Sequence, residues 1–187
     1  METEATKQEE AKRPPDLALS YAEYHQLVLS LARKIEATGW VPNQIIGIIR
    51  GAALAANILS EYWSTPCAYL AVQTYGQDKK RLDSGDIYFN RQIINNSSGF
   101  GQQALLIDDL SDTGFTLQTS YEWLLHDWNH VFKRLRCAMV FFKKDSTFIP
   151  DFYARLVEPD QAGQFPWIKQ PWEVGFHAKE DPNNFAK

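Results

Sequence analysis

Three carboxylates lie close together within the segment Ala104–Thr116, and a loop rich in hydroxyls follows them. Asp108 and Asp109 are adjacent, and Asp112 opens the sequence Asp-Thr-Gly-Phe-Thr. Carboxylates can ligate a hard cation such as Mg²⁺, together with phosphate oxygens and waters. Backbone N–H groups and threonine hydroxyls in such a loop can hold an anion. The segment could therefore hold a cation or a sugar beside a phosphate group.

The elements around this segment must place its side chains on one site. The apolar run Ala104–Ile107 predicts a buried strand, and helical spacing begins near Thr116 and continues to about Asp127. Ligands of open α/β sheets bind outside the carboxyl ends of the strands, and a helix N-terminus attracts anions. An acidic pair after a strand is often only a solvated turn. The complete unit of strand, carboxylates, glycine loop and helix favours a functional site.

A second unit of the same kind lies earlier in the chain. The apolar strand Ile45–Ile49 is followed by Arg50 and Gly51 and then by a helix near Ala52–Trp63. A cation and peptide N–H groups at a strand end can bind an anion. The alternative is an ordinary surface arginine before a helix.

The remaining pattern predicts the fold class. A capping box at Ser20–Glu23 begins a helix that reaches Gly39, and a polar loop covers Thr74–Asp86. Further strands are expected at Cys67–Gln73, Ile87–Ile93, Cys137–Phe142 and Phe152–Val157. Alternating strands and helices predict an α/β fold with a single, mostly parallel twisted sheet flanked by helices. We expect a disordered tail over residues 1–16 and one domain over residues 17–187.

Composition restricts the class of protein. The 187 residues are 44% hydrophobic with a formal net charge of −4, which favours a packed core and no binding to nucleic acid or acidic membranes. Cys67 and Cys137 lie in apolar runs and are expected to be reduced core residues. The four histidines have no metal-ligand spacing. No apolar run could span a membrane or serve as a signal peptide, so a cytoplasmic location is the default expectation.

The segment Asp108–Thr116 resembles the signature of the type I phosphoribosyltransferases, which bind phosphoribosyl pyrophosphate (PRPP). The resemblance implies that Asp108 and Asp109 contact the ribose hydroxyls directly or through Mg²⁺. It also implies that the loop Asp112, Thr113, Gly114, Phe115 and Thr116 holds the 5'-phosphate, with Asp112 as the general base facing purine N7. The alternative for Asp112 is a helix cap.

The resemblance assigns the pyrophosphate to Arg50, Gly51 and Arg81. Relatives often have a second glycine after the arginine–glycine pair, where this chain has Ala52, and sometimes a non-proline cis peptide. The segment Thr74–Arg81 resembles the mobile loop of purine-transferring members, which would close over PRPP and exclude water.

The C-terminal sequence Trp167-Ile-Lys-Gln-Pro-Trp172 resembles a stretch of the bacterial xanthine-guanine phosphoribosyltransferases. The resemblance implies that Trp167 stacks on the purine, that the Ile168 backbone meets its edge, and that Trp172 anchors the segment. Lys143 would donate to the 6-oxo oxygen, with Lys144 as a neighbouring alternative. This segment would form a small C-terminal base-binding hood on the type I phosphoribosyltransferase fold.

The implied activity is transfer of the 5-phosphoribosyl group from PRPP to guanine, xanthine or hypoxanthine, with release of pyrophosphate, in purine salvage. A non-catalytic regulator that senses PRPP or a nucleotide on the same fold is the alternative. An aspartyl phosphatase is a weaker one, because the chain lacks an Asp-x-Asp motif near its start. Relatives commonly form dimers or tetramers, so a homodimer or homotetramer is expected.

Overall fold

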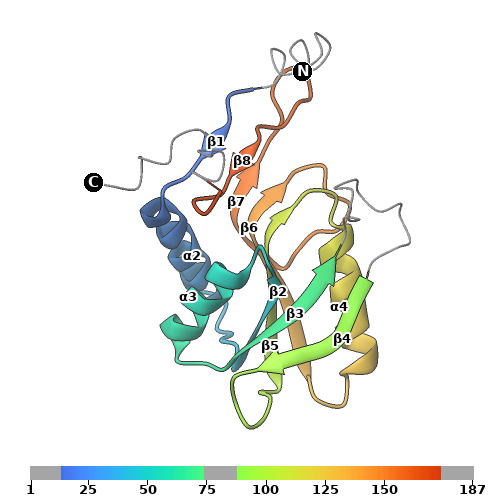
Figure 1. Ribbon diagram of the computed structural model, residues 1–187. Coiled ribbons are helices and arrows are strands. Elements are labelled where there is room, and N and C mark those ends of the chain that lie inside the picture. The colour runs from blue at the N-terminus through green and yellow to red at the C-terminus, as the bar shows by residue number, and fades with distance from the viewer. Residues whose placement is uncertain (1–13, 74–87, 174–187) are drawn as a thin grey trace, which may run out of the picture. The chain divides into compact units, whose positions relative to one another are not determined.

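The structure is a computed structural model that describes residues 14–73 and 88–173 (Figure 1). The strands are β1 (Leu17–Ala18), β2 (Gln44–Ile49), β3 (Cys67–Gln73), β4 (Tyr88–Asn95), β5 (Gln103–Ser111), β6 (Arg134–Lys143), β7 (Phe152–Val157) and β8 (Ile168–Lys169). The helices are α2 (Tyr21–Glu36), α3 (Ala53–Trp63) and α4 (Phe115–Asp127). The chain divides into a sheet unit, Leu27–Val157, and a hood unit made of the described residues up to Gln26 and from Glu158 onward.

The sheet unit contains six strands in the order β4-β3-β2-β5-β6-β7. Every neighbouring pair is parallel except β3 and β4, so the expectation of a mostly parallel sheet is confirmed. From β2 the chain continues to β3 on one side, and it later returns to β5 on the other side. The order of the strands therefore reverses between β2 and β5, which is where open α/β sheets bind ligands.

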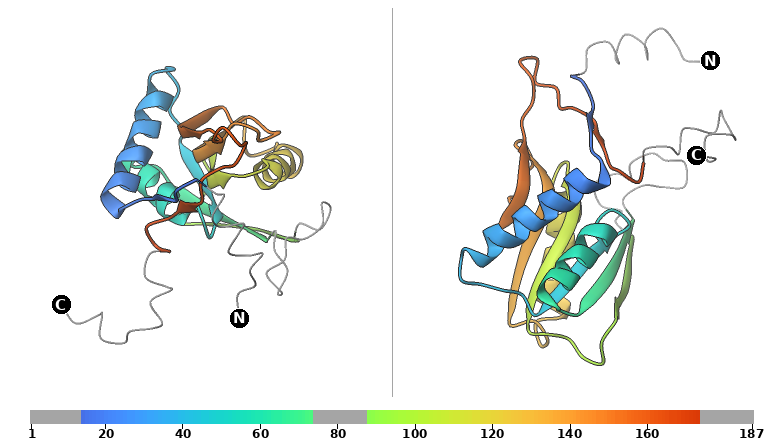
Figure 2. Two further views of the ribbon diagram at one scale, coloured as in Figure 1. Left: turned by 90° about the horizontal axis from the view of Figure 1, so that it is seen from above. Right: turned by 90° about the vertical axis from the view of Figure 1, so that its left-hand side faces the viewer.

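Helices cover both faces of this sheet. Figure 2 shows α3 on one face and α4 on the other, where they pack over β2, β3 and β5 and over β5 and β6 respectively. Burial on both faces explains why the central strands are almost continuously apolar. Gly47 of β2 allows α3 to approach closely, because a Cβ there would lie 2.7 Å from the Ala56 Cβ.

The expected elements of the sheet unit are present, and the largest differences in their ends are at two strands. β5 continues through Ser111 instead of stopping at Ile107, and β6 begins at Arg134 instead of Cys137. The two strands remain paired over this length, with Ser111 opposite Phe142. The acidic pair therefore lies near the end of β5, where pairing with β6 fixes the backbone.

The hood unit has a parallel ladder that the sequence did not predict. β1 pairs with β8, with Leu17 opposite Ile168 and Ala18 opposite Lys169. Residues 1–13 of the expected tail lie outside the described residues, whereas Asp16, its last residue, forms a 2.7 Å ion pair with Lys169. The beginning and the end of the described chain thus meet in one small sheet.

The capping box at the start of α2 is confirmed. The Ser20 N–H donates to Glu23 Oε2 at 2.8 Å, and the Glu23 N–H donates to Ser20 Oγ at 3.2 Å. This reciprocal pair satisfies two backbone donors that an α-helix leaves without partners in its first turn.

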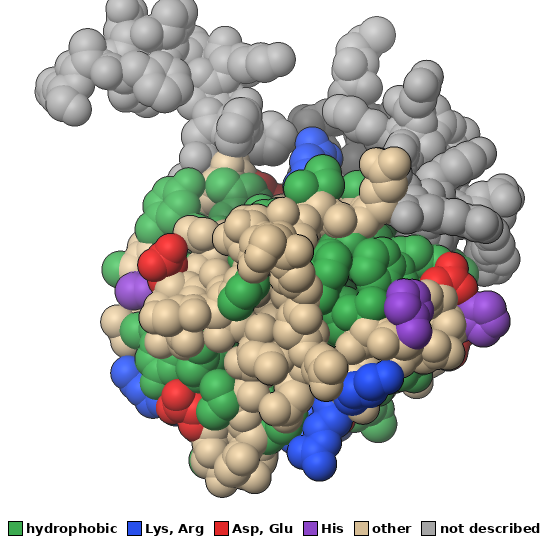
Figure 3. All heavy atoms as spheres, turned by 90° about the horizontal axis from the view of Figure 1, so that it is seen from below, with side chains coloured by type: hydrophobic (Ala, Val, Ile, Leu, Met, Phe, Trp, Pro, Cys, Tyr) green, Lys and Arg blue, Asp and Glu red, His purple; other side chains and the backbone are tan. Residues whose placement is uncertain are grey.

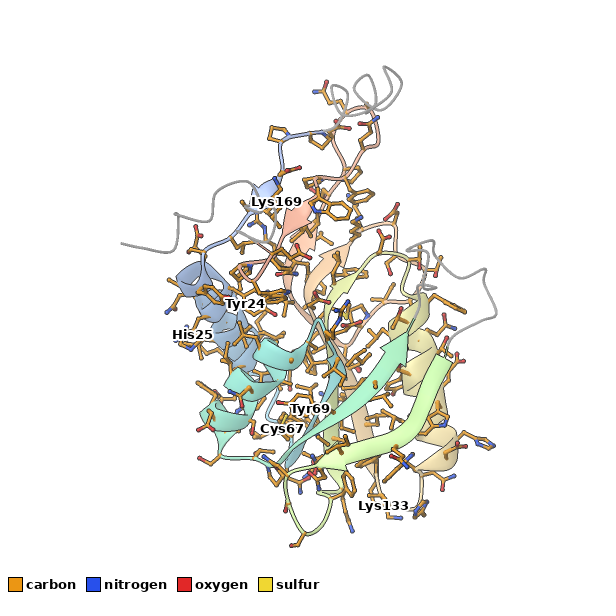
Figure 4. All side chains as sticks on the ribbon, viewed as in Figure 1. Tyr24, His25, Cys67, Tyr69, Lys133 and Lys169 are labelled. Atoms are coloured by element: carbon orange, nitrogen blue, oxygen red, sulfur yellow. The ribbon has the colours of Figure 1, made fainter. Side chains whose placement is uncertain are left out.

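Both cysteines are buried free thiols, as expected, and Figure 4 shows Cys67 beside Tyr69 on β3. Burial raises the pKa of the Cys137 thiol to about 12, so this thiol stays protonated near neutral pH. Within the described ranges, no helix is long and apolar enough to cross a membrane. On the face shown in Figure 3, Lys and Arg side chains stand in small separated groups.

Candidate active site

Three strands bring the candidate residues to one edge of the sheet. Arg50 and Gly51 follow β2, the acidic pair ends β5, and Lys143 is the last residue of β6. The register places these ends together, because Gly47 pairs with Ile107 and Lys143 immediately follows the residue opposite Ser111. Segments that lie far apart in the sequence therefore share the carboxyl edge of the sheet.

The acidic pair is held by the backbone of its own strand. Asp108 is buried, and its Oδ1 accepts a 2.9 Å hydrogen bond from the Asp109 N–H. Asp109 Oδ1 accepts a 2.8 Å bond from the Leu110 N–H. Burial raises the pKa of the Asp108 carboxyl well above its ordinary value, and the nearby charge of Asp109 adds to this rise. A cation or a hydrogen-bond donor from a ligand would stabilise both charges.

Gly51 lies directly against the Asp109 carboxylate. A Cβ at this position would be 2.7 Å from Asp109 Oδ2, closer than any ordinary contact. A side chain there would displace the carboxylate, so glycine at position 51 maintains the acidic pair. The Ile49–Arg50 peptide bond is cis, which is a feature that the family resemblance allowed for. The Arg50 side chain is exposed at this edge.

The loop Asp112–Thr116 leads directly into α4. Gly114 is the N-cap residue, with φ of +87°, and its carbonyl accepts a 2.9 Å bond from the Gln118 N–H. The N–H groups of the first turn of a helix have no partners within the helix and carry partial positive charge. This loop is therefore suited to an anion. The N-cap position belongs to Gly114, so Asp112 lies two residues before the place that a helix-cap role would require.

Asp112 and Lys143 are in direct contact. Lys143 Nζ lies 2.6 Å from Asp112 Oδ1, and the lysine side chain is only 18% exposed while that of Asp112 is 52% exposed. A carboxylate able to take a proton thus lies beside an ammonium able to donate to a carbonyl oxygen. Lys144, the alternative lysine, is exposed and its backbone N–H donates to the Val157 carbonyl.

The remaining predicted residues lie outside the sheet unit or outside the described residues. Arg81 and the segment Thr74–Arg81 lie outside the described residues. Trp167 and Ile168 belong to the hood unit, where Trp167 is 56% exposed and its backbone carbonyl accepts a 2.8 Å bond from the Leu17 N–H. Trp172 makes an edge contact with Tyr24 at 5.1 Å, which is consistent with an anchoring role.

One residue of this edge was not found from the sequence. Thr147, in the turn after β6, donates to the Thr113 carbonyl from both its backbone N–H at 3.1 Å and its hydroxyl at 2.8 Å. The partners are 34 positions apart, so no local pattern connects them. The only available signal was a hydroxyl-containing turn at the end of a strand that already carried Lys143.

Known proteins resemble this chain in sequence and in fold. Residues 20–179 match the model of the phosphoribosyl transferase domain family. A purine phosphoribosyltransferase from Pyrococcus horikoshii is 24% identical, with a TM-score of 0.65 over 86% of this chain and 95% of that one. The Helicobacter pylori xanthine-guanine-hypoxanthine phosphoribosyltransferase is 19% identical, with a TM-score of 0.66, and the match covers 88% of this chain and 98% of that chain.

A hypothetical protein from Neisseria gonorrhoeae with bound ppGpp is also similar. It is 21% identical, with a TM-score of 0.63, and the match covers 86% of this chain and 90% of that chain. These likenesses establish a shared fold, and the family match covers most of the sequence. The chain therefore belongs to the phosphoribosyl transferase domain family and has the type I phosphoribosyltransferase fold.

Proposed function

We propose that this protein transfers the 5-phosphoribosyl group from PRPP to a 6-oxopurine and releases pyrophosphate. Family membership supports phosphoribosyl transfer. The observation that carries the purine assignment is the contact between Asp112 and Lys143 beside the phosphate loop. A 6-oxopurine presents a carbonyl oxygen and a ring N–H close together, and these match an ammonium donor and a carboxylate acceptor.

Binding of PRPP would use the loop and the acidic pair. The N–H groups and hydroxyls of Thr113–Thr116 would hold the 5'-phosphate, and Asp108 and Asp109 would hold the ribose hydroxyls. Arg50 and Gly51 would bind the pyrophosphate. Arg81 is proposed for the same group on the family resemblance alone. The same resemblance is the basis for proposing that the segment Thr74–Arg81 excludes water from bound PRPP.

Asp108 and Asp109 also fit a magnesium site. No three His, Cys, Asp or Glu side chains among the described residues form a group that could hold a metal by themselves. Mg²⁺ is commonly bound through one or two carboxylates together with substrate phosphates. When bound, the ion would supply positive charge to the leaving pyrophosphate. The charge of Asp109 beside the buried Asp108 carboxyl would favour binding of such a cation.

The chemical step would exchange one bond at ribose C1 for another. The bond from C1 to the pyrophosphate oxygen breaks and its electron pair leaves with pyrophosphate, while a purine ring nitrogen donates an electron pair to C1. Asp112 would accept the proton that the purine loses at N7. Lys143 would hold the 6-oxo oxygen, and Trp167 with the Ile168 backbone would hold the ring face and edge.

The alternative is a regulator that binds a nucleotide without transferring a group. The ppGpp-bound relative is the observation in its favour, although that likeness extends only to the fold. The retained Asp112, with its Lys143 partner, favours the enzyme, because a binding protein has no need of a proton acceptor at this position.

A panel of bases tests the proposal. Purified protein is incubated with PRPP, Mg²⁺ and either guanine, xanthine, hypoxanthine, adenine or uracil, and pyrophosphate release is measured. We expect release with at least one 6-oxopurine and little with adenine, which has no 6-oxo acceptor for Lys143. Release only with adenine or uracil would refute the base assignment. Binding of PRPP or GMP with no release from any base would establish the regulator instead.

A further inference from the structure

We propose that Thr147 is a positioning residue that fixes the orientation of the 5'-phosphate loop. This inference rests on the proposed function of the loop. Thr147 would not touch the substrate. It would act by holding the Thr113 carbonyl, and through it the direction of the Gly114 N–H.

The Thr113 carbonyl oxygen accepts two hydrogen bonds from the same residue. The Thr147 N–H lies at 3.1 Å and its hydroxyl at 2.8 Å. A carbonyl oxygen has two lone pairs, so these donors use its full capacity. The carbonyl is thereby held toward the turn that follows β6.

Holding this carbonyl also aims the next N–H group. The Thr113–Gly114 peptide is trans, and in a planar trans unit the C=O and N–H bonds point in opposite directions. With its oxygen directed to Thr147, the unit directs the Gly114 N–H to the opposite side of the loop. A reversed unit would place an oxygen where the phosphate requires a donor.

Glycine at position 114 makes such a reversal possible. Rotation of a peptide unit changes ψ of the residue before it and φ of the residue after it, and glycine tolerates both signs of φ. Gly114 has φ of +87°, and it lacks a side chain because Phe148 Cβ would lie 2.8 Å from a Cβ there. Close packing therefore requires glycine at position 114, and glycine has no Cβ to restrict rotation of the Thr113–Gly114 peptide. The hydrogen bonds from Thr147 restrict that rotation instead.

The turn that carries Thr147 is itself held at several points. The Ser146 N–H donates to the Lys143 carbonyl at 3.0 Å, and the Lys144 N–H donates to the Val157 carbonyl at 3.0 Å. Ser146 is buried. The same short turn therefore connects Lys143, which contacts Asp112, with Thr147, which contacts Thr113. A loop supported in this way is preorganised for its ligand.

The substitution Thr147→Val removes the hydroxyl with little change in shape, and Thr147→Ser retains it. Thr38→Val is the matched control, because Thr38 is also exposed and its hydroxyl donates to a carbonyl, that of Ile35, at 2.7 Å. We expect Thr147→Val to raise the KM for PRPP about tenfold, the scale of one hydrogen bond, with a smaller effect on the KM for the purine. Thr147→Ser and Thr38→Val should resemble the wild type.

Calorimetry with GMP and guanosine separates a phosphate effect from general damage. The two ligands differ only in the 5'-phosphate, so Thr147→Val should weaken GMP and leave guanosine unchanged. Equal losses for both ligands, or wild-type KM values for PRPP in Thr147→Val, would overturn the inference. A wild type that binds GMP more tightly than guanosine but transfers nothing would refute the proposed enzyme and still allow this test. A wild type without preference for GMP would refute the phosphate loop and the role of Thr147 with it.

Discussion

The sheet edge and the hood unit are built by different means. At the sheet edge, the proposed functional residues lie in or just after long strands, and the pairing of Gln103–Ser111 with β6 fixes the position of the acidic pair. In the hood unit, Trp167 and Ile168 are held by β1 and β8, which are two residues long each and come from opposite ends of the described chain. The first region lies on a six-stranded sheet with a large core, whereas the second combines a two-residue ladder with a few buried side chains such as Tyr24 and Ile168.

This difference predicts different sensitivity to change. A two-stranded ladder is marginally stable without further packing, whereas a central strand of a covered sheet opens only with the whole domain. The hood ladder is supported by the edge contact of Trp172 with Tyr24 and by an ion pair of Asp16 with Lys169. Substitutions at the sheet edge should therefore cause large changes in kcat and in PRPP affinity. Substitutions in the hood should cause smaller changes in the KM for the purine.

The largest effect is expected from Asp112→Asn. The amide can still accept a hydrogen bond from Lys143, so the contact at 2.6 Å can be kept while the proton acceptor is lost. We expect kcat to fall by about 10²–10⁴, the usual contribution of a general acid–base group. PRPP affinity should change much less, because the proposed phosphate contacts are made mainly by backbone N–H groups. Steady-state kinetics and PRPP calorimetry on the same preparation measure both quantities.

Near-normal turnover of Asp112→Asn would show that this carboxylate has only a structural role. Joint loss of turnover and PRPP binding would point to a collapsed loop. Thr147→Val then serves as the comparison, since it acts on the same loop without changing an ionisable group.

The acidic pair should give the next largest effect. We expect Asp108→Asn combined with Asp109→Asn to weaken PRPP binding in the presence of Mg²⁺ by about 10²-fold, at the upper end of losses measured for groups around metals. Addition of EDTA to the wild type should have a similar effect, and EDTA should change little in the double variant. Titration calorimetry with and without Mg²⁺ makes the comparison. Wild-type PRPP affinity in the folded double variant would reject the assignment of this pair.

The double variant should remain folded, which makes the measurement interpretable. The folded-state pKa of Asp108 is raised by burial, so its contribution to stability is present below the ordinary value of 3.8 and is lost as the pH rises through the raised pKa. Ionisation of Asp108 therefore destabilises the fold relative to the neutral carboxyl. Asparagine removes that cost, and thermal denaturation should show no loss from position 108.

The sheet edge could be predicted from sequence because its information is local. The apolar run before Asp108, the glycine at position 114 and the helical spacing after it occupy one continuous segment. The helix that begins near Thr116 and the parallel sheet follow from hydrophobic spacing and turn chemistry. The site at the reversal of strand order then follows from the general behaviour of open α/β sheets.

The rest depends on contacts between distant segments. Pairing of Leu17 with Ile168, donation from Thr147 to Thr113, and the contact of Lys143 with Asp112 each need the complete fold. The length of β5 is a similar case, because polar residues beyond Ile107 stay in the strand only through pairing with β6. Propensity ends that strand early, and tertiary pairing extends it.

The two tryptophans of the C-terminal stretch should show an intermediate effect. Trp167 is exposed, whereas the ring of Trp172 packs against Tyr24. We expect Trp167→Ala to raise the KM for the purine by about tenfold or more, the scale of one base–aromatic stack, with little change in the KM for PRPP. Trp172→Ala should instead lower the melting temperature. A selective purine effect from Trp172→Ala, and none from Trp167→Ala, would reverse the assignment.

The smallest expected effect is also the sharpest test of the comparison. Asp16→Asn removes one charge of an ion pair with Lys169, in which the Asp16 side chain is 23% exposed and the Lys169 side chain 49% exposed. Pairs this accessible to water contribute about 0–1 kcal/mol, so the melting temperature should change by only a few degrees.

Because Lys169 follows Ile168 in the ladder, the loss should act on the hood, and the KM for the purine should rise about two- to threefold. The KM for PRPP should not change, and 1 M salt should abolish the difference from the wild type. Asp127→Asn is the control, because it removes a surface carboxylate that contacts His126 at the end of α4 in the sheet unit. An equal rise of both KM values in Asp16→Asn would show that the ion pair supports the whole chain, and the distinction between a rigid sheet edge and a softer hood would then be wrong.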